Sequence, residues 1–151
     1  MTTMMSLVLV ISSVSKGLTE DPRSLTNLHG YVLKNNPGPS ADFNVWVVTT
    51  ETSFDGEFLA MEEGTKKPDF ANEIAVAVSA ETHNYIYQVN FTRSELKKDE
   101  LYLYFTVRKA PADAVSGMVK LATLAKTPGL KKVHFYHDNT RIRTVPIVSV
   151  Y

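Results

Sequence analysis

Leu101-Tyr-Leu-Tyr-Phe-Thr-Val-Arg108 decides the fold class, because its side chains alternate with a period of two. Successive side chains of an extended strand point to opposite faces, so this stretch has one apolar face and one mixed face. The apolar face carries Leu101, Leu103, Phe105 and Val107, and the other carries Tyr102, Tyr104, Thr106 and Arg108. The pattern predicts a β-strand that covers a core with one face.

Three further stretches have the composition of strands. Tyr85–Phe91 alternates in the same way. Glu73–Ala80 alternates β-branched residues with small ones, and the small face predicts close approach of another layer. Asn44–Val48 is apolar on both faces, so we expect a central strand with Trp46 in or near the core.

Both ends of the sequence are also predicted to be strands. Met1–Ser15 is rich in Val, Leu and Ser, and no Lys or Arg precedes its apolar run, so we expect no secretory leader and cytosolic synthesis. Ile142–Tyr151 contains Pro146, which cannot donate to a ladder, and this predicts a sheet edge or a bulge. Ala112–Lys126 fits either a helix or a strand, and both alternatives stay open.

Turn residues separate these runs. Pro presets a turn dihedral angle and Gly accepts a positive φ, so Pro-Gly pairs are strong turn signals. Asp-Gly and Asp-Asn pairs between apolar runs suit tight hairpins. The predicted turns are Asn36-Pro37-Gly38-Pro39, Asp55-Gly56, Thr127-Pro128-Gly129 and Asp138-Asn139.

One local motif predicts a short helix. Thr92-Arg-Ser-Glu95 has the residues of a capping box, so one or two helical turns are expected over Arg93–Lys98. Leu96 precedes Tyr102 by six residues, a spacing that resembles the tyrosine corner of fibronectin-type-III and immunoglobulin-like sandwiches. Together the patterns predict a single all-β domain over residues 1–151. We expect an antiparallel Greek-key β-sandwich, immunoglobulin-like or jelly-roll-like, with one short helix.

Composition excludes several functional classes. The chain has 151 residues, an apolar fraction of 44% and a charged fraction of 21%, which are ordinary for one globular domain. It contains no cysteine, which excludes disulfides, thiol catalysis and cysteine-ligated metals. No apolar run approaches the ~20 residues that a membrane-spanning helix needs, so membrane insertion is not expected.

The zero net charge conceals an uneven distribution. Residues 1–75 contain ten acidic and five basic side chains, a balance of −5, and residues 76–151 contain six acidic and eleven basic ones, a balance of +5. Acidic and basic surfaces on one molecule suit head-to-tail contact between copies. The candidate partner-binding residues are Lys131, Lys132, Arg141, Arg143, Glu57, Glu62 and Glu63. The basic residues lack the Gly-rich or aromatic-interleaved motifs that favour nucleic acid as a partner.

No catalytic residues, metal ligands or cofactors are predicted. His134 and His137 form an H-x-x-H, but side chains three apart on a strand point to opposite faces, so we expect structural roles. Ser94 and Lys97 match an S-x-x-K pattern, as do Ser13 and Lys16, without the accompanying S-D-N or K-T-G motifs. No P-loop, dinucleotide fingerprint or G-x-S-x-G is present.

Aromatic side chains supply an alternative binding site. If two consecutive strands pair and share an outer tyrosine face, the rings form a platform on which sugars stack. The competing interpretation, favoured because Val89 and Phe91 share their face, places Tyr85 and Tyr87 in the core. The candidate ligand-binding residues are Trp46, Tyr85, Tyr87, Tyr102 and Tyr104.

These observations predict a non-enzymatic structural or interaction protein. It would assemble with itself or dock on a larger particle, for example as a capsid-decorating, minor-capsid or tail-accessory subunit of a virion. This expectation follows from the missing catalytic motifs, the strand-forming chain ends and the divided charge. The alternative is a carbohydrate-binding module that uses its surface aromatics.

Overall fold

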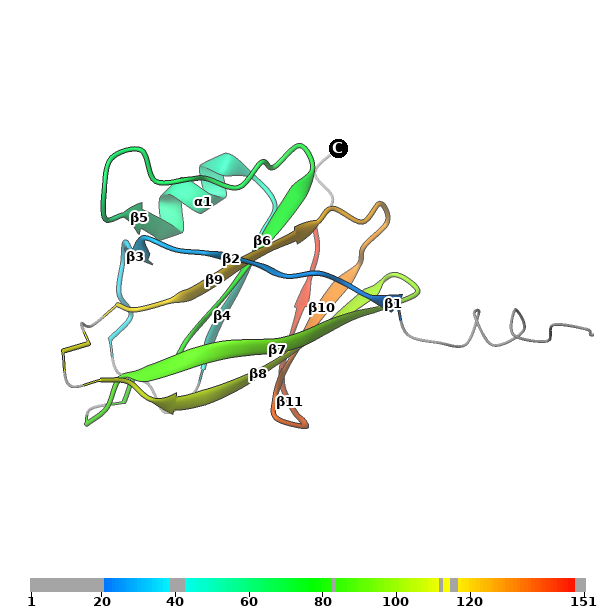
Figure 1. Ribbon diagram of the computed structural model, residues 1–151. Helices are drawn as coiled ribbons and strands as arrows, with labels where there is room; N and C mark the ends of the chain where they lie inside the picture. The colour runs from blue at the N-terminus through cyan, green and yellow to red at the C-terminus, as the bar shows by residue number, and fades with distance from the viewer. Residues whose placement is uncertain (1–20, 39–42, 83, 112, 115–116, 149–151) are drawn as a thin grey trace, which may run out of the picture.

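The computed structural model describes residues 21–38, 43–82, 84–111, 113–114 and 117–148. It confirms the all-β sandwich, with 54% of the residues in strands, 6% in helix and one short helix. Figure 1 shows two large sheets packed face to face, with a helix and a small two-stranded sheet on the far side of one of them. The predicted strand over Met1–Ser15 lies outside the described residues.

The first sheet has five strands in the order β1-β7-β8-β10-β11. Its long central hairpin, β7 and β8, turns at Lys98 and Asp99, where Lys98 has a φ of 57°. The strands are β1 (Asp21–Pro22), β7 (Tyr87–Lys97), β8 (Glu100–Lys109), β10 (Lys132–His137) and β11 (Thr140–Pro146).

The second sheet has four strands in the order β2-β9-β6-β4, and a separate pair joins β3 to β5. The strands are β2 (Thr26–Leu28), β4 (Asn44–Val48), β6 (Glu73–Ser79) and β9 (Lys120–Ala125), with β3 (Tyr31–Leu33) and β5 (Phe58–Ala60) in the pair. The helix α1 (Glu51–Glu57) lies between β4 and β5 in the sequence.

One pairing departs from an antiparallel arrangement, because β8 and β10 run parallel. The chain leaves the first sheet after β8, forms β9 in the second sheet, and returns to the first sheet as β10. Parallel neighbours need a crossover connection of this kind, whereas antiparallel neighbours can be joined by a tight turn.

The interior core fills the space between the two large sheets. Alternation in β8 sends Leu101, Leu103 and Phe105 inward, each 3% exposed or less. Opposite them lie Ile74, Val76 and Val78 of β6 and Ala122 and Leu124 of β9. The apolar face predicted for Leu101–Arg108 is therefore confirmed.

A second core lies on the other face of β6. Ala75 and Ala77 have no exposed surface, and α1 packs over them through Phe54. The ring of Phe54 contacts Tyr31 edge-on at 5.1 Å between centroids and Phe58 at the same distance. Small residues let this layer approach closely, so the prediction from Glu73–Ala80 is confirmed.

Two of the predicted turns occur as expected. Leu130 N donates to the Thr127 carbonyl at 3.2 Å across Pro128-Gly129, and Gly129 has the positive φ that such a turn needs. Asp138-Asn139 closes the β10–β11 hairpin, in which His137 pairs with Thr140. At Asn36, the side chain accepts from Gly38 N at 3.0 Å, and Pro39 lies outside the described residues.

The predicted helix over Arg93–Lys98 is wrong, because all of this segment except the turn residue Lys98 continues β7. Thr92 lies at a bulge where its hydroxyl donates to the Tyr104 carbonyl at 3.2 Å, so it caps no helix. Leu96 pairs with Leu101 and packs on the interior core, and this burial outweighs the local capping signal. The tyrosine corner is also absent, since Leu96 and Tyr102 belong to one hairpin.

The predicted hairpin turn at Asp55-Gly56 is wrong as well, because both residues lie inside α1. Thr50 caps this helix by accepting from Ser53 N at 3.2 Å, and burial of Phe54 anchors it. A helix of seven residues is too short to persist alone, so its packing stabilises it.

The remaining strand predictions are confirmed with one change of position. Asn44–Val48 is a strand, but it forms the edge of the second sheet, and most of its residues are half-buried. Trp46 packs against the second core, as expected. β11 is the edge of the first sheet and contains Pro146, but it ends there instead of continuing through the predicted Ile142–Tyr151, of which residues 149–151 lie outside the described residues. The C-terminal half of Ala112–Lys126 is the strand β9.

Phe54→Ala is expected to lower the free energy of unfolding by about 3–5 kcal/mol, because it leaves a cavity beneath α1. Urea denaturation followed by circular dichroism measures this loss. Leu59→Ala is the matched control, since Leu59 is 53% exposed and should change stability by about 0.5 kcal/mol or less. Equal losses for the two variants would contradict the assignment of Phe54 as the anchor of this layer.

Candidate functional site

Lys131 and Lys132, two basic residues of the predicted partner surface, form ion pairs with carboxylates of the same chain. Lys131 Nζ lies 2.9 Å from Asp99 Oδ2, and Lys132 Nζ lies 3.9 Å from Glu100 Oε1. Hydrogen bonding to Asp99 raises the pKa of Lys131, and the same bond lowers the pKa of Asp99. These lysines therefore fasten the start of β10 to the β7–β8 turn, although exposed pairs of this kind stabilise little.

Arg141 and Arg143 differ from the two lysines in both position and pairing. Both lie on the edge strand β11 and are exposed, and neither side chain bonds to any residue in the described part of the chain. In the β10–β11 ladder, Arg141 pairs with Tyr136 near the hairpin turn, whereas Lys132 lies at the opposite end of β10. The four basic residues thus form two separate pairs.

The predicted acidic residues gather around α1 and β5. Glu57 ends the helix, while Glu62 and Glu63 follow β5, and all three are exposed. No side-chain partner of these three carboxylates exists among the described residues. Lys67, which follows Glu62 and Glu63 closely in the sequence, instead bonds to Asp55 at 2.9 Å and to Glu51 at 3.3 Å.

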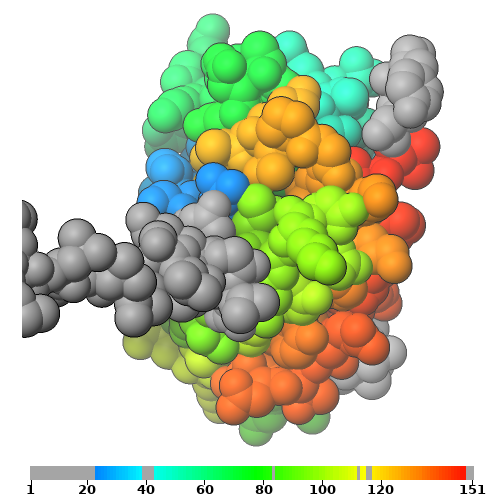
Figure 2. All heavy atoms as spheres, turned by 90° about the vertical axis from the view of Figure 1, so that its right-hand side faces the viewer, coloured from blue at the N-terminus to red at the C-terminus, as the bar shows by residue number. Residues whose placement is uncertain are grey.

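The two unneutralised groups lie at opposite ends of the molecule. Figure 1 shows α1 and β5 at the top and the β10–β11 turn at the bottom. Figure 2, turned by 90°, shows the same separation. We call Glu57, Glu62 and Glu63 the acidic end, and Arg141 and Arg143 the arginine edge.

The candidate aromatic residues do not share one face. Tyr87 lies on the side of β7 that also carries Val89 of the interior core, whereas Tyr102 and Tyr104 lie on the outer face of β8. Tyr85 contacts Tyr87 at 6.3 Å and is 43% exposed. Trp46 belongs to the other sheet, where it meets Phe58 edge-on at 5.9 Å.

The outer face of the first sheet has an aromatic group that the sequence patterns did not reveal. Tyr136 of β10 stacks on Tyr104 at 5.0 Å between centroids and lies 6.1 Å from Tyr102. Arg93 covers the Tyr104 ring at 4.0 Å, and Lys97 covers the Tyr102 ring at 4.6 Å. The sequence shows that Tyr136 lies two residues after His134, on the same face of a strand. Only the β8–β10 pairing shows that this face also carries the rings of Tyr102 and Tyr104.

The histidines occupy separate environments, as the strand spacing predicted. His134 is buried on the outer face, where Nδ1 lies 2.7 Å from Thr144 Oγ1 and Nε2 lies 3.3 Å from Glu100 Oε1. His137 stacks on Phe105 at 5.5 Å. Within the described ranges, no group of three His, Asp or Glu residues could hold a metal ion.

The S-x-x-K residues of β7 are also apart. Ser94 is 2% exposed and its hydroxyl donates to the Arg23 carbonyl at 2.5 Å, while Lys97 lies over Tyr102. The serine therefore faces inward and the lysine faces outward. The other match, Ser13 and Lys16, lies outside the described residues.

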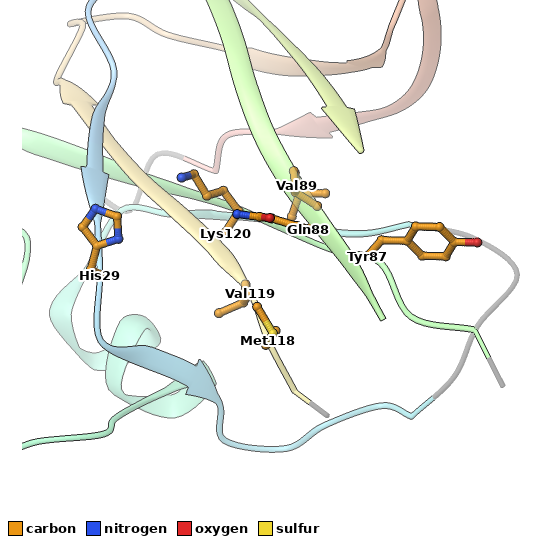
Figure 3. A pocket seen from close by; sticks show the side chains of 8 residues that line it. His29, Tyr87, Gln88, Val89, Met118, Val119 and Lys120 are labelled. Carbon is orange, nitrogen blue, oxygen red and sulfur yellow. The ribbon is translucent and has the colours of Figure 1, made fainter. Parts of the chain in front are cut away.

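A cavity of about 190 Å³ opens at one end of the sandwich. Figure 3 shows it between β9 and the start of β7, with His29 on the segment that leads from β2 to β3. Its walls are formed by His29, Val78, Tyr87, Gln88, Val89, Met118, Val119 and Lys120.

Lys120 is the charged residue of this cavity. Burial lowers the pKa of its amine below the ordinary value. Sequence patterns do not identify it, because Ala112–Lys126 fits either a helix or a strand. Once β9 is a strand, Lys120 shares a face with the buried residues Ala122 and Leu124.

Comparison with protein-family models, with curated proteins and with solved structures finds no match to this chain. In the described part of the chain, no helix is long and apolar enough to cross a membrane.

Lys120→Met is expected to raise the melting temperature by about 2 °C or more at pH 7, because it removes a desolvated charge and keeps the side-chain length. The sign follows from the pKa. A lowered folded-state pKa means that the protonated amine destabilises the fold, and this penalty disappears as the pH rises above the unfolded value of 10.5. Differential scanning calorimetry measures the shift.

The matched control is Lys98→Met, which removes an exposed lysine from the β7–β8 turn and should leave the melting temperature unchanged. A Lys120→Met protein that melts earlier than the wild type would contradict a destabilising amine in this cavity.

Proposed function

We propose that this protein is a non-enzymatic structural subunit that assembles head to tail with copies of itself. The observation that supports the proposal is that an acidic group and a basic group, at opposite ends of the molecule, form no ion pairs within the described part of the chain. Glu57, Glu62 and Glu63 at one end, and Arg141 and Arg143 at the other, have no side-chain partners in the described part of the chain. The lysines closer to carboxylates are already paired.

The position of each group supports contact between different surfaces of two copies. A two-fold interface centred on the arginine edge would place it against another arginine edge, where like charges repel. A head-to-tail interface instead places the arginine edge of one copy against the acidic end of the next. Because such contacts repeat, they build rings or filaments rather than closed dimers.

Strand β11 adds a second reason for contact at this place. It is a sheet edge, and its free backbone groups can pair with another chain unless charges keep that chain away. The arginines repel an identical edge and accept an acidic surface. The same edge suits docking on a larger particle with an acidic surface, such as a virion built from repeated subunits.

The test uses two charge-reversed variants, one with Arg141→Glu and Arg143→Glu and the other with Glu57→Lys, Glu62→Lys and Glu63→Lys. The wild type is expected to exceed the monomer mass at about 0.1 M salt and to dissociate at about 1 M, where the Debye length falls from ~10 Å to ~3 Å. Each variant alone should be monomeric. Size-exclusion chromatography with light scattering measures the masses.

Mixing the two variants supplies the decisive comparison. Each variant retains one native surface that is complementary to the other variant, so the mixture should recover masses above the monomer. The matched control is Lys98→Glu with Lys126→Glu, which makes the same charge change at exposed lysines elsewhere and should assemble like the wild type. A wild-type monomer at low salt, or a mixture that stays monomeric, would overturn the proposal.

A further inference from the structure

Lys120 occupies an inward position of the sandwich. It pairs with Val78 of β6, which has no exposed surface. On β9 it lies on the same face as Ala122 and Leu124, the face that lines the interior core. An apolar residue is the expected occupant of such a position. The side chain lies at the end of β9, where the interior core meets the open end of the sandwich.

Within the described residues, the amine has no compensating partner. Among the described residues, no carboxylate lies within ion-pairing distance of Lys120, and no hydrogen bond to its Nζ is formed. The ring of His29 likewise has no hydrogen-bond partner there. Figure 3 shows the Lys120 side chain extending from β9 toward the side of the cavity that carries His29. A partly buried amine without a partner destabilises a fold unless something else binds it, whereas the His29 side chain is exposed.

The rest of the cavity combines apolar walls with the polar side chains of His29, Tyr87 and Gln88. Val78, Val89, Met118 and Val119 contribute to its walls, and its 190 Å³ equals the volume of roughly six waters at about 30 Å³ each. A wider depression of about 440 Å³ adjoins it and shares His29, Met118, Val119 and Lys120. That depression adds the apolar side chains of Leu28, Val32 and Met61, and its carboxylate is Asp113.

We propose that this cavity binds a small carboxylate with a short apolar chain, whose carboxylate group pairs with Lys120 while the chain lies along Val89 and Met118. One amine matches a monovalent anion, whereas a phosphate needs several converging donors. The ring of His29 and the side-chain amide of Gln88 are further nitrogen groups of the cavity that can donate to the anion. The apolar walls favour a hydrocarbon chain over a second charge.

The site is separate from the acidic end and the arginine edge, so it adds a ligand to the proposed subunit. Hexanoate is the probe, and hexanol is its neutral counterpart of similar length. In ¹⁵N-resolved NMR titrations, hexanoate is expected to shift the amide signals of residues 87–89 and 118–120. Hexanol should bind about tenfold more weakly, because its hydroxyl carries no negative charge to pair with the ammonium.

Lys120→Met tests the role of the amine without removing the cavity. Its spectrum away from the cavity confirms that it folds, and it should bind hexanoate about tenfold more weakly than the wild type while binding hexanol equally well. Lys98→Met is the control with the same loss of charge and should bind both probes like the wild type. The proposal is overturned if hexanoate causes no shifts around the cavity, or if Lys120→Met binds hexanoate as tightly as the wild type.

Discussion

Strand β6 is buried on both faces, and this constraint orders the layers of the molecule. Its β-branched residues face the interior core, while Ala75 and Ala77 face α1 and the β3–β5 pair. Larger side chains at the alanine positions would push the helical layer away, because interiors are packed without free space. The cavity beside Lys120 follows from the same arrangement, since it lies where β6 and β9 reach the end of the sandwich.

Sequence periodicity predicted the strands that have one buried face. Elsewhere, tertiary contacts determined the secondary structure against the local sequence signals. Leu101–Arg108 alternates so regularly that its inner and outer faces could be assigned residue by residue. Thr92-Arg-Ser-Glu95 carries a helix signal worth about 1 kcal/mol, which a ladder pairing with burial of Leu96 exceeds. The turn predicted at Asp55-Gly56 was wrong for the converse reason. Burial of Phe54 stabilises a helix that includes these two turn-forming residues.

The sequence predicted which charged residues lie on the surface, but it did not predict which of them pair with one another. Net balances along the chain identified Glu57, Glu62, Glu63, Arg141 and Arg143, and exposure agrees with that choice. The neutralisation of Lys131 by Asp99 required the adjacency of β10 and the β7–β8 turn. Tyr136 and Lys120 were missed for a related reason: a strand neighbour distant in the sequence determines what each side chain meets.

The passage of the chain from β8 to β9 and back to β10 has a consequence for folding. Because β9 lies in the second sheet, the parallel neighbours β8 and β10 are joined by a connection that passes to that sheet and back. Closing this long connection costs chain entropy before the parallel ladder is gained. Pairings as distant as Asp21 with Leu96 add to the chain entropy lost before burial is gained. The topology places this protein among slow-folding β-proteins, with time constants of about milliseconds to seconds.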